Sequence, residues 1–391
     1  MDTMDKKSFV ITNLLRNLVF IYFDTFFAIY YFNLINNNVF ELGKYYFFVY
    51  LFSVLSFWIL KKAIKNFKVP YYRLGISFTA FYLMLIMLLK EKIVDYIVIV
   101  ALFKGLGDGL YWYPRNIMNA TKITNAERRK HLSIINSIAQ ICSIVVPILL
   151  GVLLTYFDYV QIGKVVFLIM IVVFILSYFT KEELVTRRKD ITLKEFFHKL
   201  KTHKKVRQIF IIQFLKGFTI SGGVLTVVMS IYKILYFKSN LYIGTLNSII
   251  GLVTFITCLI YFKISKRNYK IISMATLIIV GISLLVLGIK PNTISFLVYL
   301  FVYATGVTII SLLSDNIVVN ICTNDPVLSE NKEEYHLVLE SFLALARVLG
   351  YILLMIIGLI NQNLINVILI LSIIPLMYLV YYMVLNIDDL E

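Results

Sequence analysis

Two adjoining stretches near the middle of the chain decide its organisation. Residues 161–180 read QIGKVVFLIMIVVFILSYFT, and residues 181–207 read KEELVTRRKDITLKEFFHKLKTHKKVR. The first stretch is long enough to cross the hydrocarbon of a bilayer as a helix, which takes about 20 apolar residues. The second carries ten Lys and Arg residues, more than any other connector, and therefore separates two apolar halves.

Apolar runs of the same length recur on both sides of this connector. The chain is 60% apolar and 15% charged, against about 45–50% and about 25% in a soluble domain. Strict alternation over about ten residues, the signature of a membrane β-barrel, is not found. We therefore predict an all-α polytopic membrane protein with twelve spans, at residues 9–34, 41–60, 72–90, 93–119, 131–156, 161–180, 207–232, 240–262, 271–289, 293–322, 335–361 and 364–386.

Several classes of protein are excluded by composition. Thirty Phe and 27 Tyr argue against disorder, and three cysteines inside apolar runs argue against a disulfide scaffold. Dispersed basic residues argue against a nucleic-acid binder, despite a net charge of +16. The histidines have no metal-ligand spacing, and no strand precedes the glycine-rich Gly105–Gly109, which fits close helix packing better than a nucleotide loop. We expect no metal, no cofactor and no enzyme activity.

Basic residues orient the spans across the membrane. With both termini in the cytoplasm, 26 Lys and Arg residues fall in inside segments and 7 in outside segments. We therefore expect a multi-pass protein of a bacterial cell membrane with both termini cytoplasmic. Its domains would be a six-helix bundle at 1–180, a cytoplasmic basic linker at 181–206 and a second six-helix bundle at 207–391.

The linker itself has the pattern of an amphipathic helix. Thr192 and Glu195 form a capping box, and the apolar residues Leu193, Phe196, Phe197 and Leu200 follow at helical spacing. Lysines occupy the other faces, so the segment 192–205 is expected to lie on anionic lipid of the inner leaflet. A solvated helix that joins two bundles is the alternative.

Ionisable residues inside the spans are the candidate functional residues. A charge at the bilayer centre costs about 2.5–3.5 kcal/mol, so such residues usually pair or face a cavity. Lys104 and Asp108 are four residues apart and can pair within one helix, Asp24 can meet Lys104, and Arg16 can approach Asp108 or Arg115. Structural ion pairs are the alternative. The nine residues are Arg16, Asp24, Lys104, Asp108, Arg115, Lys216, Asp315, Glu340 and Arg347.

The whole pattern resembles the major facilitator superfamily. The resemblance rests on two six-span halves, a long basic central loop and cytoplasmic ends, and locally on Tyr111-Trp112-Tyr113-Pro114-Arg115-Asn116, Pro147 and Gly151. The family's loop motif between spans two and three is reduced here to the basic stretch Lys61–Lys68, without its glycines and aspartate. The sequences around Arg115 and Asp315 lie 200 residues apart and are weakly alike, which suggests duplicated halves.

The resemblance implies a cavity lined by spans one, four, seven and ten, which hold seven of the nine ionisable residues. It implies secondary active transport of a small molecule by alternating access, and we expect proton-coupled efflux by a monomer. Asp24 and Asp315 are candidates for proton coupling, Lys216 and Arg347 for contacting an anionic group, and Arg115 with Asp315 for a cytoplasmic gate. Uptake of a nutrient or metabolite, a non-transporting sensor or immunity protein, and a membrane enzyme are the alternatives.

Overall fold

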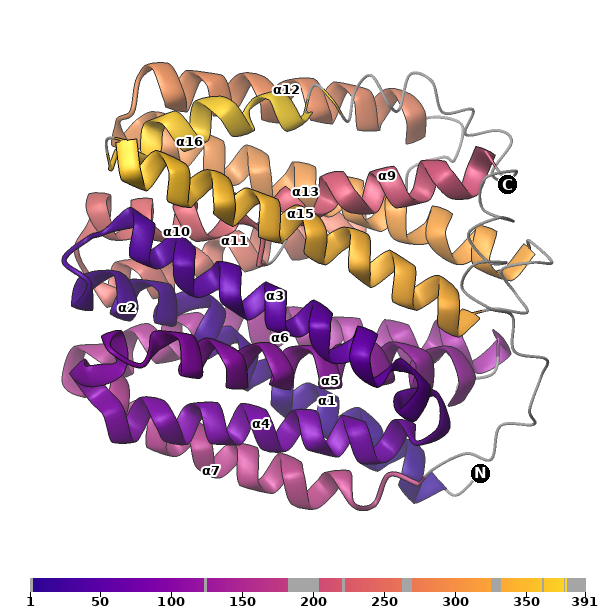
Figure 1. The fold of residues 1–391 in the computed structure, drawn as a ribbon. Helices are drawn as coiled ribbons and strands as arrows, with labels where there is room; N and C mark the ends of the chain where they lie inside the picture. The colour runs from indigo at the N-terminus through magenta and orange to yellow at the C-terminus, as the bar shows by residue number, and fades with distance from the viewer. Residues whose placement is uncertain are drawn as a thin grey trace. The chain divides into compact units, whose positions relative to one another are not determined.

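The computed structural model describes residues 3–122, 125–181, 204–219, 222–261, 269–324, 332–360, 362–375 and 377. These residues form helices and connecting turns, without a β-strand (Figure 1). They pack into two compact units. The first consists of Met1–Arg188 and Lys233–Ser248, and the second of Lys189–Tyr232 and Ile249–Glu391. The expected amphipathic helix at 192–205 lies outside the described residues.

The first unit is built from long helices joined by short turns. α5 packs against both α3 and α4, while α1 packs against α6 and α7. A π-helix, η1, interrupts the first span between α1 and α2. The elements are α1 (Thr3–Tyr22), η1 (Phe23–Phe27), α2 (Ala28–Leu34), α3 (Val39–Asn66), α4 (Lys68–Leu89), η2 (Lys90–Val94), α5 (Ile97–Lys122), α6 (Asn125–Tyr156) and α7 (Tyr159–Ser177).

The second unit contains the later helices of the chain. α9 packs against α15, and α12 packs against α13 and α16. The elements are α9 (Lys204–Thr219), α10 (Val224–Phe237), α11 (Asn240–Tyr261), α12 (Tyr269–Ile289), α13 (Thr293–Asn324), α15 (Lys332–Ile360) and α16 (Leu364–Leu371). Residues Lys233–Ser248, the end of α10 and the start of α11, belong to the first unit.

Ten helices in the described residues are long and apolar enough to cross a membrane. They coincide with ten of the twelve expected spans. The other two expected spans correspond to α5, which carries the four charged residues Lys104, Asp108, Arg115 and Lys122, and to the shorter apolar helix Leu364–Pro375. α5 begins at Ile97 and not at the expected residue 93, because Lys90–Val94 form a separate 3₁₀ turn.

Turn chemistry explains where several helices begin. Asn36 and Asn37 adopt positive φ angles of 52° and 63°, which asparagine tolerates better than most residues. Asn38 then caps α3 by accepting hydrogen bonds from the backbone N–H groups of Phe40 and Glu41. At the start of α7, Asp158 and Gln161 form a reciprocal capping box.

Arg73 of α4 forms hydrogen bonds with the C-terminal end of α7. Its guanidinium donates hydrogen bonds to the carbonyl oxygens of Ser177, Tyr178 and Thr180, at 3.2, 3.2 and 2.8 Å. A cation at a helix C-terminus also complements the negative end of the helix dipole. This contact holds the chain at the point where the expected linker starts.

Candidate functional site

Glycines bring α5 into close contact with both of its neighbours. A Cβ atom at Gly109 would lie 2.5 Å from the carbonyl oxygen of Ser53 on α3. A Cβ atom at Gly75 of α4 would lie 2.6 Å from the backbone nitrogen of Tyr111 on α5. Gly105 and Gly107 are equally confined against α3 and α4. The expectation that the glycine-rich stretch serves close packing is therefore confirmed, and it fixes the position of Asp108 between these glycines.

Asp108 is held between two cations. Its Oδ1 atom accepts a hydrogen bond from Nη2 of Arg16 at 2.9 Å, and its Oδ2 atom accepts one from Nζ of Lys104 at 2.5 Å. Arg16, Lys104 and Asp108 are 1%, 9% and 8% exposed. The pair expected within α5 is therefore present, and α1 supplies the second cation. Removing one partner of such a buried pair typically costs about 3–5 kcal/mol, because it leaves an uncompensated charge.

Aromatic rings surround the cation of Arg16. The Cζ atom of Arg16 lies 3.7 Å from the ring centre of Tyr111, which places the ring against the guanidinium. The rings of Trp112 and Phe20 follow at 5.4 and 5.9 Å. Phe20 also lies 5.4 Å from Nζ of Lys104. These ring faces attract cations, and they leave the edges of the guanidinium for hydrogen bonding.

Asn13 forms a second polar centre one turn before Arg16 on α1. Its side-chain oxygen accepts hydrogen bonds from the hydroxyl groups of Tyr111 and Tyr72, at 2.5 and 3.3 Å, and from Nε of Arg115 at 3.2 Å. Its amide nitrogen donates to the carbonyl oxygen of Phe9 at 2.8 Å. The described hydrogen bond of Arg115 is thus to an amide, and this links α1, α4 and α5 beneath the charged cluster.

The donors of the charged cluster exceed its acceptors. Within the described part of the chain, Nε and Nη1 of Arg16 are buried and have no hydrogen-bond partner. Burying such a donor without an acceptor costs about 1–3 kcal/mol, and more for a charged group. The three ionised side chains also leave one positive charge in excess. The charged cluster, defined here as Arg16, Lys104 and Asp108, can therefore accept a further anion.

The other six candidate residues are distributed over both units. Asp24 lies in the π-helix η1 and Asp315 in α13, but their side chains lie outside the described residues. Lys216 is buried near the end of α9. Glu340 and Arg347 are half-buried on α15, where Leu343 and Ala346 face Gly217 of α9. Lys216, Glu340 and Arg347 are thus carried by two helices in contact, whereas the charged cluster lies in the first unit.

The seventh span is interrupted beside Lys216. α9 ends at Thr219 and α10 starts at Val224, with Gly222 at a φ of 80°. The hydroxyl of Tyr303 donates to the carbonyl of Thr219, and that of Tyr351 donates to the carbonyl of Gly222 at 2.9 Å. Gly222 and Gly223 therefore lie between the two described helices of this span.

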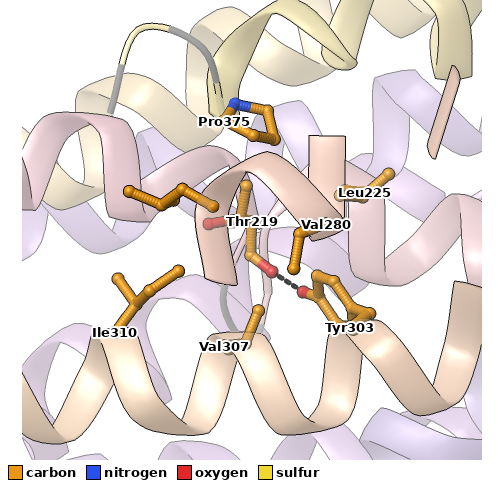
Figure 2. Close-up of a pocket in the computed structure, with 8 residues that line it drawn as sticks. Thr219, Leu225, Val280, Tyr303, Val307, Ile310 and Pro375 are labelled. Atoms are coloured by element: carbon orange, nitrogen blue, oxygen red, sulfur yellow. Dashed lines mark hydrogen bonds between the residues drawn. The ribbon is translucent and has the colours of Figure 1, made fainter. Parts of the chain in front are cut away.

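A small pocket lies against this break (Figure 2). Figure 2 shows the side chain of Tyr303 directed at Thr219, with Val280, Val307, Ile310 and Pro375 around them. The cavity has a volume of about 20 Å³, which is the space of a single water molecule. It is too small for a metabolite in this conformation.

A larger hollow in the first unit is of a different kind. It measures about 540 Å³ and lies between α1, α6 and α7. Its walls are almost entirely apolar, with Leu18, Leu149, Val165 and Ile169 among them and Gln161 at one point. Such a surface on membrane-spanning helices offers a ligand nothing to pair with, so the charged cluster remains the candidate site.

Comparison with known proteins identifies the family to which the fold belongs. The family model for the Major Facilitator Superfamily matches residues 9–327. No protein of curated function matches the sequence. Similar solved structures are the nucleoside transporter NupG (TM-score 0.71, 13% identity, 98% of each chain covered) and a D-xylose-proton symporter (0.70, 14%, 96% of each chain). A bacterial homologue of the iron transporter ferroportin is also similar (0.69, 12%, 98% of this chain and 100% of that one). The chain therefore belongs to the Major Facilitator Superfamily of multi-pass membrane transporters.

Proposed function

We propose that this transporter is a proton-coupled secondary active transporter of a small molecule, and that Asp108 carries the proton. One observation carries the proposal: a buried carboxylate bridges cations from two different helices, Arg16 on α1 and Lys104 on α5. Protonation of Asp108 would weaken both contacts at once. A ligand or proton can shift a conformational equilibrium only through such a difference in contacts between states.

Export is the direction we propose, by alternating access between the two sides of the membrane. The rings of Phe20, Tyr111 and Trp112 beside Arg16 suit a substrate that is partly apolar. Uptake is the second candidate, because one similar structure is titled a D-xylose-proton symporter. Under an imposed proton gradient, a proton-driven exporter accumulates its substrate on the acidic side of the membrane and a proton symporter on the alkaline side, so vesicles with a pH gradient separate the two.

The test of proton coupling uses the double substitution Lys104→Gln with Asp108→Asn. This variant removes the carboxylate but keeps the net charge of the cluster, so it should insert and fold. Purified protein is placed in liposomes that contain the pH-sensitive dye pyranine, and a panel of sugars, nucleosides, organic anions and organic cations is added under an imposed pH gradient. We expect the wild-type protein to accumulate a compound while protons move in the opposite direction.

The double variant should exchange the same compound without gradient-driven accumulation. Asp158→Asn is the matched control, because asparagine also caps a helix and Asp158 lies at the start of α7. Proton-driven accumulation by the double variant would exclude Asp108 as the coupling group. Asp24 would then be the next candidate, followed by Asp315 and Glu340, as the sequence suggested.

We also propose that both termini and the basic segment 181–206 face the cytoplasm, and that 192–205 contacts anionic lipid. The distribution of 26 Lys and Arg residues on one side against 7 on the other supports this orientation. In a variant without native cysteines, a cysteine at position 290 should react with an impermeant maleimide in intact cells. A cysteine at position 195 should stay unlabelled, and its labelling would contradict the orientation.

A further inference from the structure

Arg16 has unused hydrogen-bonding capacity at a definite place. Only its Nη2 atom contacts Asp108, while Nε and Nη1, both buried, have no acceptor among the described residues. Tyr111 covers one face of the guanidinium at 3.7 Å, so an additional partner must come from the edge of the group. Nε–H and Nη1–H point to opposite edges of the planar group, and either one can donate a charge-assisted hydrogen bond to an oxygen of a carboxylate.

The charges around Arg16 favour a single negative charge. Lys104 and Arg16 together carry two positive charges, and Asp108 supplies one negative charge. One added monoanion would make the charged cluster neutral. In this structure the two oxygens of Asp108 accept from Nη2 of Arg16 and from Nζ of Lys104, and neither Nε nor Nη1 of Arg16 reaches an acceptor among the described residues.

The residues around Arg16 also indicate the chemical nature of the rest of the bound compound. Phe20 and Trp112 are both half-buried, and their rings meet edge to face with centres 6.0 Å apart. Together with Tyr111 they present aromatic carbon beside the guanidinium. Such carbon surfaces bind apolar groups and rings, whereas a fully hydrated anion would lose its water without replacement.

We propose that the charged cluster binds the carboxylate of a small monoanionic compound with an aromatic or apolar body, and that an unpartnered N–H group of Arg16, Nε–H or Nη1–H, donates a hydrogen bond to that carboxylate. This inference rests on the proposed function, because it names the substrate class of the same cluster. The ring of the ligand packs on Phe20 and Trp112, and its carboxylate supplies the acceptor that the buried donors of Arg16 lack.

The chain offers a natural reporter for this binding. It contains two tryptophans, Trp58 and Trp112, so Trp58→Phe leaves Trp112, at 5.4 Å from Arg16, as the only source of tryptophan fluorescence. In detergent, this protein is titrated with benzoate, phenylacetate and cyclohexanecarboxylate, each against its neutral amide. We expect at least one carboxylate to change the fluorescence saturably and to bind about ten times more tightly than its amide, or better. Equal responses to acid and amide in all three pairs would overturn the proposal.

Substitution separates the role of Arg16 from that of charge alone. Arg16→Lys keeps a cation beside Asp108 but lacks the planar guanidinium with its further N–H groups at Nε and Nη1, so carboxylate binding should weaken about tenfold or more. Arg73→Lys is the matched control, because Arg73 lies in the same unit and binds carbonyl groups at the end of α7. Binding by Arg16→Lys at wild-type strength would place the carboxylate elsewhere and overturn the assignment.

A measurement on the unchanged residue makes the test independent of folding defects. Phenylglyoxal modifies arginine side chains, and peptide mass spectrometry measures its rate at Arg16. Benzoate should slow modification of Arg16 at least several-fold, whereas benzamide should not. Equal rates with both compounds would contradict the proposal.

Binding and coupling fail in distinguishable ways. Carboxylate binding is measured on the protein with Lys104 and Asp108 intact and without a pH gradient, whereas coupling is measured as gradient-driven accumulation by the variant Lys104→Gln with Asp108→Asn. Carboxylate binding by the intact cluster, together with loss of accumulation in the double variant, supports both proposals. Proton-coupled transport of a compound other than a carboxylate, without carboxylate binding, would overturn this inference and leave the proposed function intact.

Discussion

The first spans of the two units are both interrupted, but in different ways. In the first unit the chain remains helical through η1, and the polar groups inside are charged side chains: Arg16 meets Asp108 across two helices. In the second unit the described part of α9 ends at Thr219, Gly222 has a φ of 80°, and α10 starts at Val224, and tyrosine hydroxyls donate to the carbonyls of Thr219 and Gly222. In a membrane every backbone polar group needs such a partner.

This difference suggests separate tasks for the two units. A buried carboxylate between two cations can change its contacts when it gains a proton, and it does so without altering the backbone. A helix break closed by two hydroxyl groups can change its backbone angles at the expense of two neutral hydrogen bonds, which are weaker than bonds to charged groups. We therefore expect substitutions in the first unit to have the larger effects on stability.

The largest effect should follow the loss of Asp108 alone. Asp108→Asn leaves Arg16 and Lys104 as two uncompensated buried cations, so it should destabilise the protein by about 3–5 kcal/mol. Adding Lys104→Gln should recover part of that loss, because it removes one of the two cations. Thermal unfolding in detergent, followed for the two single variants and the double variant, measures this coupling. A strictly additive result would show that the two side chains act independently.

A somewhat smaller effect is expected at the tight contact between α5 and α3. Gly109→Ala would place its Cβ atom 2.5 Å from the carbonyl oxygen of Ser53, so the helices must separate, at about 3 kcal/mol for an overpacked core. Gly281→Ala on α12 is the matched control, since its Cβ atom would meet Pro375 at an ordinary 3.4 Å. Similar melting temperatures for the two variants would refute the tight fit assigned to α5.

The residues of the charged cluster could be identified from the sequence, whereas the polar residues around them could not. The spacing of Lys104 and Asp108 along one helix is a local property, and charged residues in an apolar span are conspicuous, so these members could be identified. Asn13 was missed because an uncharged polar residue in a span carries no comparable signal. Its role depends on Tyr72 and Tyr111, which the fold brings to it from α4 and α5.

The break in the seventh span shows the same limit. Two adjacent glycines, Gly222 and Gly223, are a local sequence feature at the break. Glycine accepts a positive φ angle, and Gly222 has one. The hydroxyl groups that complete it come from Tyr303 and Tyr351, which lie 84 and 129 residues away from their acceptors. Pairings over such distances depend on how α9, α13 and α15 pack, and not on a local pattern.

Asn13 provides the third test of the expected difference between the two units. Asn13→Leu removes the acceptor shared by Tyr72, Tyr111 and Arg115, so it should destabilise the protein by about 2 kcal/mol. Thr12→Val is the control at the adjacent position, because the buried hydroxyl of Thr12 has no partner among the described residues. Thermal unfolding should show a lower melting temperature for Asn13→Leu only. Equal losses would mean that the polar centre around Asn13 contributes nothing specific.

The smallest effect should come from the second unit, at the helix break. Tyr351→Phe removes the hydroxyl that donates to the carbonyl of Gly222, a neutral hydrogen bond that contributes about 1 kcal/mol. Tyr299→Phe is the control, because the buried hydroxyl of Tyr299 has no partner among the described residues. Hydrogen–deuterium exchange should become faster in peptides around Gly222 for Tyr351→Phe and stay unchanged for Tyr299→Phe. A loss of stability as large as that of Asp108→Asn would contradict the proposed difference, because it would mean that the helix break, and not the charged cluster, carries the more strongly held polar contacts.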